Sequence, residues 1–282
     1  MNNRQTWMIT AASSGFGRAL AEAVLAKGDC VLATARNALT LEELAARAPQ
    51  RCFTAPLDVT NDEQVAAAVS IGETQLGGID VLANIAGAGV LAPLESLSDD
   101  VFRSQFETNC LGAIKLIRAV LPAMRERKAG HIVNISAIPG FCNEPGFSAY
   151  GASKAALEAA SEAVALEVAP FGINVSLIIP GPFRTDFIKR TLSTSSDTNG
   201  AYQPTVGRLR GALETLDGHQ QGDPVRAAEA ILRLVESENP PLRLAIGPYA
   251  IRQIRRKLQM VAAEVDAWEE VGQNTGFAVG LH

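Results

Sequence analysis

No stretch of this 282-residue sequence reaches the roughly 18 consecutive apolar residues that a transmembrane helix needs. The first ten residues, MNNRQTWMIT, also lack the apolar run of a secretory signal peptide. We therefore expect no membrane partner and a cytoplasmic location.

Cysteine and histidine are scarce, with four and three residues in the whole chain. The cysteines form no Cys-x-x-Cys pair, so neither disulfides nor a metal site are expected. Each falls in or beside an apolar segment, which favours a small core residue over a ligand. They are Cys30, Cys52, Cys110 and Cys142.

An excess of positive charge is missing too, because the formal net charge is -5. Such a chain would repel a polyphosphate, and we expect no nucleic-acid partner. The short basic patch at 252–257 is interpreted as the solvated face of a late helix. The apolar side of that helix would carry Ile251, Ile254, Leu258 and Val261.

What the chain does have is a regular alternation of short apolar runs and amphipathic stretches. Its 47% hydrophobic content suffices for one large core. Because each crossover helix returns the chain to the same end of a sheet, the strands must be parallel. The predicted strands are 7–10, 31–35, 52–57, 81–86, 131–136, 174–180 and 242–247, and the predicted helices are 15–27, 40–47, 62–76, 98–124, 150–169, 224–237 and from about 249.

The predicted fold is therefore α/β: a doubly wound, Rossmann-like parallel sheet of about seven strands with helices on both faces. Residues 1–282 would form one dinucleotide-binding and catalytic domain. The polar, irregular segment 191–222 is expected to form a substrate flap. Residues 223–282 would complete the fold as a helix, a strand and a helix.

A glycine-containing turn joins the first predicted strand to its helix. Glycines here let the backbone approach a pyrophosphate, which the free N–H groups of the helix end would face. Such glycines are also simple helix caps, so the turn alone does not identify a dinucleotide site. The residues assigned to the cofactor are Thr10, Ser13, Ser14, Gly15, Phe16 and Gly17.

The ends of the next three strands supply further candidate contacts. Arg36 stands where an acid would grip the ribose 2′-OH, and its guanidinium suits a 2′-phosphate, so NADP is favoured over NAD. Asp58 would cap the adenine amino group, and Asn84 would brace its turn. Each could equally be an ordinary surface or turn residue. The neighbours Val59, Ala86 and Gly87 complete this part of the predicted site.

The most informative stretch is 148–154 (SAYGASK), which opens a long amphipathic helix. Tyr150 and Lys154 are four residues apart and project from one helix face, so an ammonium can lie beside the phenol. A neighbouring cation lowers the pKa of a tyrosine toward the range of general acid–base catalysis.

With these residues in order, the chain resembles the short-chain dehydrogenase/reductase family over about residues 1–190. The likeness rests on the glycine turn, the N-N-A-G-like segment NIAG, the Y-x-x-x-K pair and a P-G turn followed by threonine. It implies that Tyr150 donates or accepts the proton, that Lys154 binds the nicotinamide ribose, and that Asn109 holds a water in a proton relay. It also adds the cofactor contacts Pro180, Gly181, Phe183 and Thr185.

Three positions depart from the family pattern. Ala11 replaces the first glycine of the turn, at a cost of about 1 to 2 kcal/mol if the backbone there is left-handed. Ile85 replaces the second asparagine of N-N-A-G. Ala137 stands where the family's second serine, in N-I-S-S, hydrogen-bonds the substrate oxygen.

The missing serine leaves three alternatives. Ser136 turns inward through a local irregularity, since regular alternation would place it on the other face. Otherwise Asn143 or Ser148 substitutes, or activity is low, because losing one such donor costs about 100- to 1,000-fold in rate. Ser136 is kept with Tyr150, Lys154 and Asn109 as the predicted catalytic set.

We therefore predict an NADP-dependent oxidoreductase that interconverts a carbonyl and an alcohol on a small, apolar substrate. A weak or inactive dinucleotide-binding sensor is the main alternative, and an isomerase or lyase is a third. The substrate wall would come from loops 88–95, 138–148 and 182–210. Their large apolar residues are Leu91, Ile138, Phe141, Phe147, Phe183, Phe187 and Tyr202.

Helices 98–124 and 150–169 carry apolar residues on more than one face and need cover beyond their own sheet. A homodimer or homotetramer would supply it, or else the C-terminal helices of the same chain. The residues concerned are Phe102, Phe106, Leu111, Ile114, Leu116, Ile117, Leu157, Val164, Leu166 and Val168.

Overall fold

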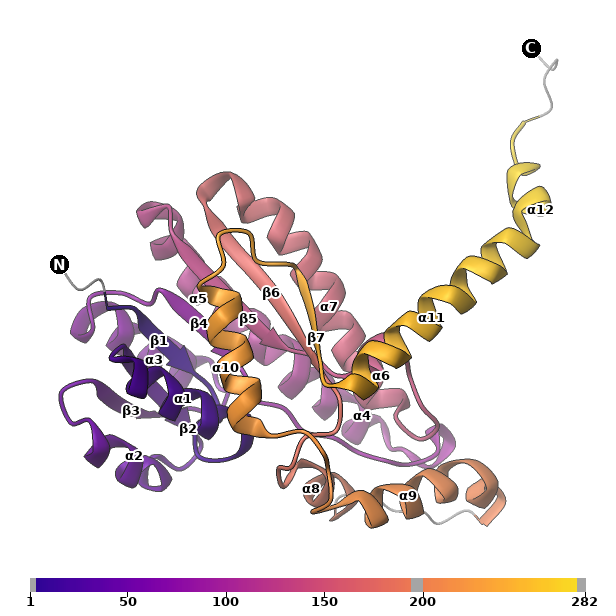
Figure 1. Cartoon of the computed structure of the whole chain (residues 1–282), viewed down its shortest axis with the longest axis horizontal. Coiled ribbons are helices and arrows are strands. Elements are labelled where there is room, and N and C mark those ends of the chain that lie inside the picture. Colours follow the sequence, from indigo (N-terminus) through magenta and orange to yellow (C-terminus); the bar gives the residue numbers. More distant parts are fainter. Residues whose placement is uncertain (1–3, 194–199, 278–282) are drawn as a thin grey trace.

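The computed structural model describes residues 4–193 and 200–277, in which seven strands form one parallel sheet (Figure 1). The strands are β1 (Thr6–Ile9), β2 (Cys30–Ala35), β3 (Cys52–Pro56), β4 (Val81–Asn84), β5 (Gly130–Ile135), β6 (Ile173–Pro180) and β7 (Arg243–Ile246). Their order across the sheet is β3-β2-β1-β4-β5-β6-β7. The predicted doubly wound α/β fold is confirmed.

Helices cover both faces of this sheet (Figure 1). One face carries α1 (Gly15–Lys27), α10 (Pro224–Val235) and α2 (Glu42–Arg47), which the 3-10 turn η1 (Ala38–Leu41) precedes. The other face carries α3 (Asp62–Gln75), α5 (Gly112–Arg127) and α7 (Ser148–Val168), with the 3-10 turns η2 (Leu94–Ser96) and η4 (Ala169–Phe171) in connecting loops.

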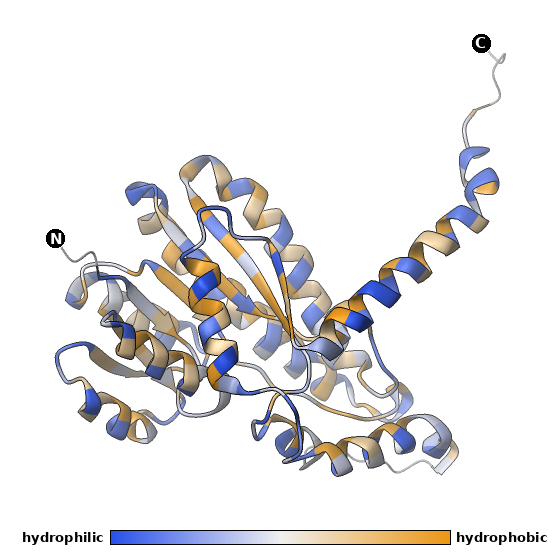
Figure 2. Cartoon of the chain, in the orientation of Figure 1, coloured by the Kyte–Doolittle hydropathy of each residue, from blue (hydrophilic) through white to orange (hydrophobic). Residues whose placement is uncertain are grey.

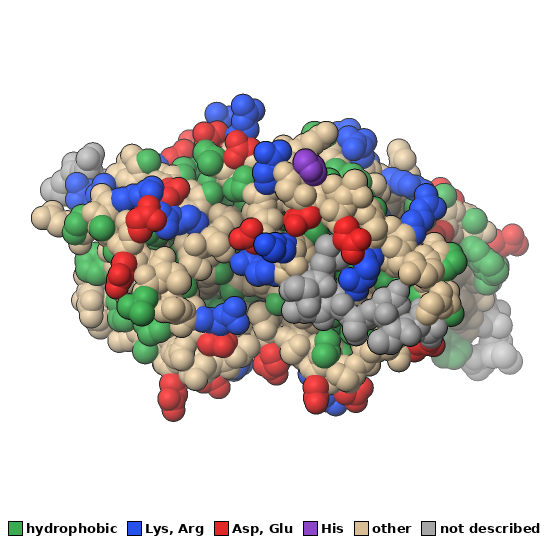
Figure 3. All heavy atoms as spheres, turned by 90° about the horizontal axis from the view of Figure 1, so that it is seen from below, with side chains coloured by type: hydrophobic (Ala, Val, Ile, Leu, Met, Phe, Trp, Pro, Cys, Tyr) green, Lys and Arg blue, Asp and Glu red, His purple; other side chains and the backbone are tan. Residues whose placement is uncertain are grey.

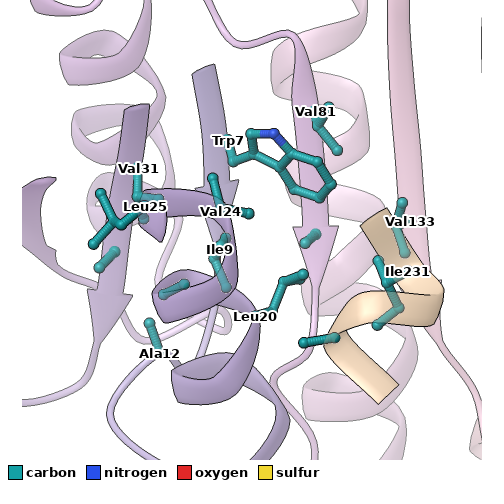
Figure 4. Packing of buried hydrophobic residues seen from close by; sticks show 14 of the residues in the cluster. Trp7, Ile9, Ala12, Leu20, Val24, Leu25, Val31, Val81, Val133 and Ile231 are labelled. Atoms are coloured by element: carbon teal, nitrogen blue, oxygen red, sulfur yellow. The ribbon is translucent and has the colours of Figure 1, made fainter. Parts of the chain in front are cut away.

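Alternate side chains of the strands build a hydrophobic core on each face. On β1, Trp7 and Ile9 pack with Leu20 of α1 and Ile231 of α10 (Figure 4), whereas Met8 belongs to the opposite core. Figure 2 shows hydrophobic residues gathered along the central strands.

Side-chain and glycine caps mark the ends of three predicted helices, 15–27, 98–124 and 224–237. Ser98 accepts a hydrogen bond from the Val101 N–H at the start of α4 (Asp99–Phe106), and Asp223 caps α10 through the N–H two residues on. Gly28 ends α1 with a φ of 102°. These three boundaries are confirmed.

The predicted helix 98–124 is interrupted by a π-helical turn. α4 continues through η3 (Glu107–Leu111) directly into α5. Such turns hold one extra residue and are frequent at functional sites. Asn109 lies within this one.

The segment between β6 and α10 is mostly helical at the carboxyl end of the sheet (Figure 1). Of the predicted flap 191–222, residues 194–199 lie outside the described residues. The elements are α8 (Phe187–Ser193), η5 (Gly200–Tyr202), the π-helical η6 (Gln203–Gly207) and α9 (Arg208–Leu216).

After β7 the chain leaves the body as α11 (Pro248–Ala267), and α12 (Glu269–Gln273) continues outward (Figure 1). The first turns of α11 pack against α6 (Ile138–Phe141) and β7. The alternative in which the C-terminal helices cover α4 and α7 is therefore wrong.

His131 of β5 is buried, with Nε2 3.0 Å from Ser176 Oγ on β6. Burial lowers the pKa of His131 to about 4 from its ordinary 6.5. Between these pH values the unfolded chain binds a proton that the folded chain does not, so stability is lost as the pH falls from 6.5 to 4.

We expect His131→Gln to remove part of this acid sensitivity while keeping a polar group beside Ser176. The wild-type chain should lose on the order of 3 kcal/mol more unfolding free energy between pH 6.5 and 4 than the variant. Urea unfolding at a series of pH values measures the difference. His219→Gln, at an exposed histidine, is the control and should lose the same unfolding free energy as the wild type. An equal dependence of the unfolding free energy on pH in all three proteins would contradict the role of His131.

Candidate active site

The carboxyl ends of β1 and β4 meet where the strand order reverses, since β1 pairs with β2 on one side and β4 on the other. Open α/β sheets bind ligands at such a point. Thr10 Oγ1 accepts hydrogen bonds here from the N–H groups of Ile85 at 2.8 Å and Ala86 at 2.9 Å. Thr10, predicted as a cofactor contact, thus braces the loop after β4.

The turn between β1 and α1 has the form of an anion cradle. Gly15 has a φ of 55°, and Ser14 and Ser13 lead into α1 without a side-chain cap. A Cβ on Gly17 would lie 2.3 Å from the Ala11 carbonyl oxygen, so this approach requires glycine. Because the first turn of α1 has no acidic residue, its N–H groups and dipole favour a phosphate.

Ala11 adopts a left-handed conformation with a φ of 52°. The methyl group at this departure from the family pattern therefore carries strain, of about 1 to 2 kcal/mol. The turn forms nonetheless, and the Ala12 N–H donates to the Thr34 carbonyl at 2.9 Å.

The loop after β6 closes the other side of the cradle. The Phe183 ring meets Phe16 edge to face with centroids 5.1 Å apart, and a Cβ on Gly15 would lie 3.3 Å from Thr185 Cγ2. Arg190 of α8, a residue that sequence reasoning missed, donates from Nη1 to Ser14 Oγ at 3.3 Å. Such a guanidinium suits an anionic ligand. The loop starts at the predicted contacts Pro180 and Gly181.

Asp58 and Arg36 lie at the ends of β3 and β2. The Thr60 N–H and hydroxyl donate to Asp58 Oδ1 at 2.9 and 2.7 Å, and these bonds, with a smaller contribution from Arg36, lower the pKa of Asp58. Val59 is buried against Gly112. Asp58 therefore stabilises the turn in which it lies, whereas Arg36 is exposed at the same edge of the sheet.

Asn84 begins a buried polar network. Its Nδ2 donates to Asn134 Oδ1 at 2.9 Å, and Asn134 donates to Ser161 Oγ at 2.8 Å. Asn84 Oδ1 is buried with no hydrogen-bond partner in the described part of the chain, which leaves it available to a ligand. Ile85 packs against the core around α1, so apolar contact replaces the family's polar side chain.

Asn109 ties the loop after β4 to α7. Its Nδ2 donates to the Ala88 carbonyl at 2.9 Å, and its Oδ1 accepts from the Ala88 N–H at 2.8 Å. The same Nδ2 donates to Ser153 Oγ at 3.0 Å, which donates to the Tyr150 carbonyl at 2.7 Å. Asn109 is thereby brought together with the predicted catalytic pair.

Lys154 is buried, and its Nζ donates to the Ile135 carbonyl at 2.7 Å. Burial lowers the pKa of Lys154 to about 8. A Cβ on Gly87 would lie 3.4 Å from Lys154 Nζ and 3.1 Å from Asn109 Oδ1. The absence of a side chain at Gly87 therefore leaves room beside both polar groups.

The Tyr150 ring lies between Phe147 and Phe187, with both centroids at 5.6 Å. Burial raises the pKa of Tyr150. The predicted lowering of this pKa is wrong for the chain alone, because the Lys154 ammonium donates to a backbone carbonyl and burial dominates.

Ser136 does not face Tyr150. Its hydroxyl donates to Glu158 Oε1 at 2.6 Å, while the adjacent Ala137, in extended backbone, packs with Tyr150. The strand alternation is regular here, so the inward turn that a catalytic Ser136 requires is absent, and we correct that assignment.

Glu158 is a second residue that sequence reasoning missed. Besides Ser136 it meets Arg243 of β7, with Oε2 3.5 Å from Arg243 Nε. A Cβ on Gly140 would lie 2.9 Å from Lys154 Cβ and 3.1 Å from Glu158 Oε1, so the carboxylate lies near the stem of the Lys154 side chain. The spacing of four residues from Lys154 was the available signal.

The two other candidates for the missing donor differ in their surroundings. Asn143 is exposed, and its Oδ1 accepts from the Glu144 N–H at 2.9 Å. Ser148 Oγ is buried and has no hydrogen-bond partner among residues 4–193 and 200–277. A buried hydroxyl without a partner is unusual, which favours Ser148.

Apolar side chains from the segments that follow β4, β5 and β6 pack with Tyr150, and we name them the Tyr150 cluster. Of the predicted wall residues, Ile138 and Phe183 pack elsewhere and Phe141 is half-buried in α6. The cluster contains Leu91, Ala137, Phe147, Phe187, Tyr202, Val206, Leu209 and Leu213.

In the described residues no His, Cys, Asp and Glu side chains group as a metal site, and no helix is both long and apolar enough to cross a membrane. Figure 3, a view from below Figure 1, shows basic and acidic side chains interspersed over that face. This pattern differs from the continuous basic stripe of a nucleic-acid surface.

Comparison with curated proteins finds relatives over most of the chain. Oxidoreductase BOA17 of Botryotinia fuckeliana is 37% identical over 94% of this chain and 97% of its own. The 3-ketodihydrosphingosine reductase of Bacteroides thetaiotaomicron is 36% identical over 86% and 88%. Retinol dehydrogenase 8 of Homo sapiens is 37% identical over 85% and 80%.

Solved structures agree with these relatives. A short-chain dehydrogenase from Streptomyces avermitilis is 42% identical, with a TM-score of 0.90 over 98% of this chain and 100% of that one. A short-chain dehydrogenase from Burkholderia cenocepacia in complex with NADP is 25% identical, with a TM-score of 0.70 over 95% of each chain. Residues 5–196 match the family model described as short chain dehydrogenase. The chain is a member of the short-chain dehydrogenase/reductase family of oxidoreductases.

Proposed function

We propose that the chain is an NADP-dependent oxidoreductase that interconverts a carbonyl and an alcohol on a small apolar substrate. The observation that carries this proposal is the position of Tyr150, whose ring lies in an apolar cluster while Lys154 and Asn109 meet beside Gly87 at the polar strand ends. A phenol at such a boundary can exchange a proton with a substrate oxygen.

The strand ends fit a nicotinamide dinucleotide, which when bound supplies the hydride donor or acceptor. The cradle around Gly15 and Gly17 would hold the pyrophosphate, with Arg190 as a further cation. The unpartnered Asn84 Oδ1 would meet a polar group of the ligand. Arg36 would hold a 2′-phosphate, and the NADP of the Burkholderia structure supports that cofactor.

Tyr150 would carry the proton at its hydroxyl oxygen. The raised pKa keeps the phenol protonated at neutral pH, as a donor in carbonyl reduction must be. Lys154, with a pKa of about 8, is mostly charged at that pH and would favour the phenolate as the proton leaves.

The nature of the Tyr150 cluster supports an apolar substrate. Two relatives are named for 3-ketodihydrosphingosine and retinol, compounds with an oxygen function on a hydrocarbon framework. Leu91, Phe147 and Val206 would contact the hydrocarbon and exclude water from the reacting oxygen.

Tyr150→Phe should lower kcat/KM for carbonyl reduction about 100- to 10,000-fold, the usual contribution of a general acid. NADPH absorbance with a panel of apolar aldehydes and ketones measures it. Tyr249→Phe is the control, because Tyr249 bonds to Glu144 outside the Tyr150 cluster, and it should keep wild-type turnover. Turnover unchanged in Tyr150→Phe would overturn the proposed role.

A catalytically silent sensor is the second candidate function, and Ala137 is the observation that favours it. The buried bonds of Asn109 to the Tyr150 helix and of Lys154 to the end of β5 have no evident use in such a protein. Tight NADPH binding without consumption of any carbonyl in the panel would favour the sensor.

We infer that the unpartnered hydroxyl of Ser148 substitutes in part for the serine that Ala137 replaces. Ala137→Ser should then raise kcat/KM at least about tenfold, because a full donor of this kind contributes about 100- to 1,000-fold. Ser148→Ala should lower kcat/KM in the wild type and much less in the Ala137→Ser background. Ala152→Ser at the half-buried Ala152 is the control and should not raise kcat/KM. Additive effects of Ala137→Ser and Ser148→Ala on kcat/KM would contradict the inferred role of Ser148.

Arg36→Ala should raise the Kd for NADPH about 10- to 100-fold, the loss of charge-assisted hydrogen bonds to a phosphate. The Kd for NADH should change less than about threefold, since NADH lacks that phosphate. Fluorescence titration measures both constants. Arg47→Ala removes a comparable exposed arginine, which is paired with Glu43, and should change neither Kd. An equal rise of both Kd values in Arg36→Ala would contradict the role of Arg36 as a 2′-phosphate contact.

We also propose a homodimer or homotetramer that covers the outward sides of η3 and α7. Leu111 is 39% exposed there and Leu166 76%, and a symmetric partner would bury both. The cytoplasmic location stays a prediction.

A further inference from the structure

Beyond its first turns α11 stands clear of the body (Figure 1), and hydrophobic residues recur along it (Figure 2). Leu258 is 54% exposed, Val265 63% and Trp268 69%. Solvent exposure of a continuous apolar row is unfavourable and marks a surface that another molecule covers.

The spacing of this row indicates what covers it. Its residues recur at alternating intervals of three and four, which gives the 3.5-residue repeat of a two-stranded coiled coil. Such a row is narrower than the apolar face of a helix that packs on a protein core. We name these residues the α11 seam: Ile251, Ile254, Leu258, Val261 and Val265 of α11, and Trp268 directly after it. All are exposed except Ile254, which is half-buried because it packs partly against the body.

We propose that α11 pairs with α11 of a second copy of this chain as an antiparallel two-stranded coiled coil. Charge complementarity favours this occupant. The first half of the helix is basic and the end of α11 with the start of α12 is acidic, so an antiparallel copy sets each half against its opposite. The basic residues are Arg252, Arg255, Arg256 and Lys257, and the acidic ones are Glu264, Asp266, Glu269 and Glu270.

The antiparallel register covers the exposed seam positions and the part of Ile254 that its own body leaves accessible. Ile251 meets Trp268 of the second copy, Ile254 meets Val265, and Leu258 meets Val261. Each pair then joins an a to a d position of the heptad.

The flanking charges select the direction of the pair. In the antiparallel register Lys257 lies within about 3 Å along the axis of Glu264 of the second copy, twice by symmetry. A parallel pair would instead set Lys257 against Ala262 of the second copy, where it gains no such contact. The antiparallel pair also leaves the two bodies at opposite ends of a rod about 30 Å long.

A lipid surface is the competing occupant, and the charges disfavour it. An anionic bilayer would attract the basic half of the helix and repel the acidic half. The proposal therefore concerns a second copy, and it does not depend on the reaction proposed above.

Cysteine crosslinking of the full chain tests the register. Positions 251 and 268 are about 25 Å apart within one helix, too far for an internal disulfide. The double variant Ile251→Cys with Trp268→Cys should form a covalent dimer under mild oxidation, seen on a non-reducing gel, whereas each single variant and the wild type should not. A dimer from Ile251→Cys alone, or none from the double variant, would overturn the antiparallel pair.

Charge reversal tests the polar contacts. By sedimentation equilibrium, Lys257→Glu and Glu264→Lys should each raise the dissociation constant of the α11 contact at least tenfold, and the double reversal should restore it to within threefold. Gln259→Glu, on the solvent side of the helix, is the control and should change it little. Circular dichroism checks that each variant is folded.

Two outcomes of these measurements would refute the pair. One is a double reversal as weak as the single changes. The other is a wild-type chain that shows no self-association through α11 in sedimentation equilibrium and that floats with phosphatidylserine vesicles.

Discussion

A buried ammonium group governs the arrangement of this protein's strand ends. Lys154 Nζ lies in the interior, where an unpaired charge would be costly, and the Ile135 carbonyl at the end of β5 holds it. Gly87 and Gly140 lack side chains where the lysine passes, and Glu158 lies one turn further along α7. The loop after β4, the helix α6 and the helix α7 are thus positioned around one charge.

Sequence reasoning recovered the sheet because hydrophobic alternation reflects burial, which the fold must satisfy everywhere. It also paired Tyr150 with Lys154 from their helical spacing, whereas Asn109 joined them only through the family resemblance. Arg190 was missed because α8 carries no motif. Glu158 was missed because its partners Ser136 and Arg243 lie on other elements, far from it in the sequence. Ala11 was correctly marked as a site of strain if its backbone proved left-handed, as it is.

Ser136 shows where resemblance and physics disagreed. The alternation of an extended strand placed its hydroxyl away from Tyr150, and the structure has it bonded to Glu158. Its retention among the catalytic residues came from the family pattern alone. Neighbouring strand residues face opposite ways. A hydroxyl at position 137 would therefore face the substrate side, whereas the hydroxyl at position 136 instead bonds to the helix that carries Lys154.

The π-helical turn at Glu107–Leu111 has a consequence for which changes of length the chain tolerates. Each residue of a regular helix turns the chain by about 100°, so one extra residue sets α4 and α5 to face different neighbours. α4 contacts α7, whereas α5 packs on β4 and β5. Deleting a single residue between them would straighten the helix and rotate one half off its neighbour, so the packing on both sides fixes the number of residues within that helix.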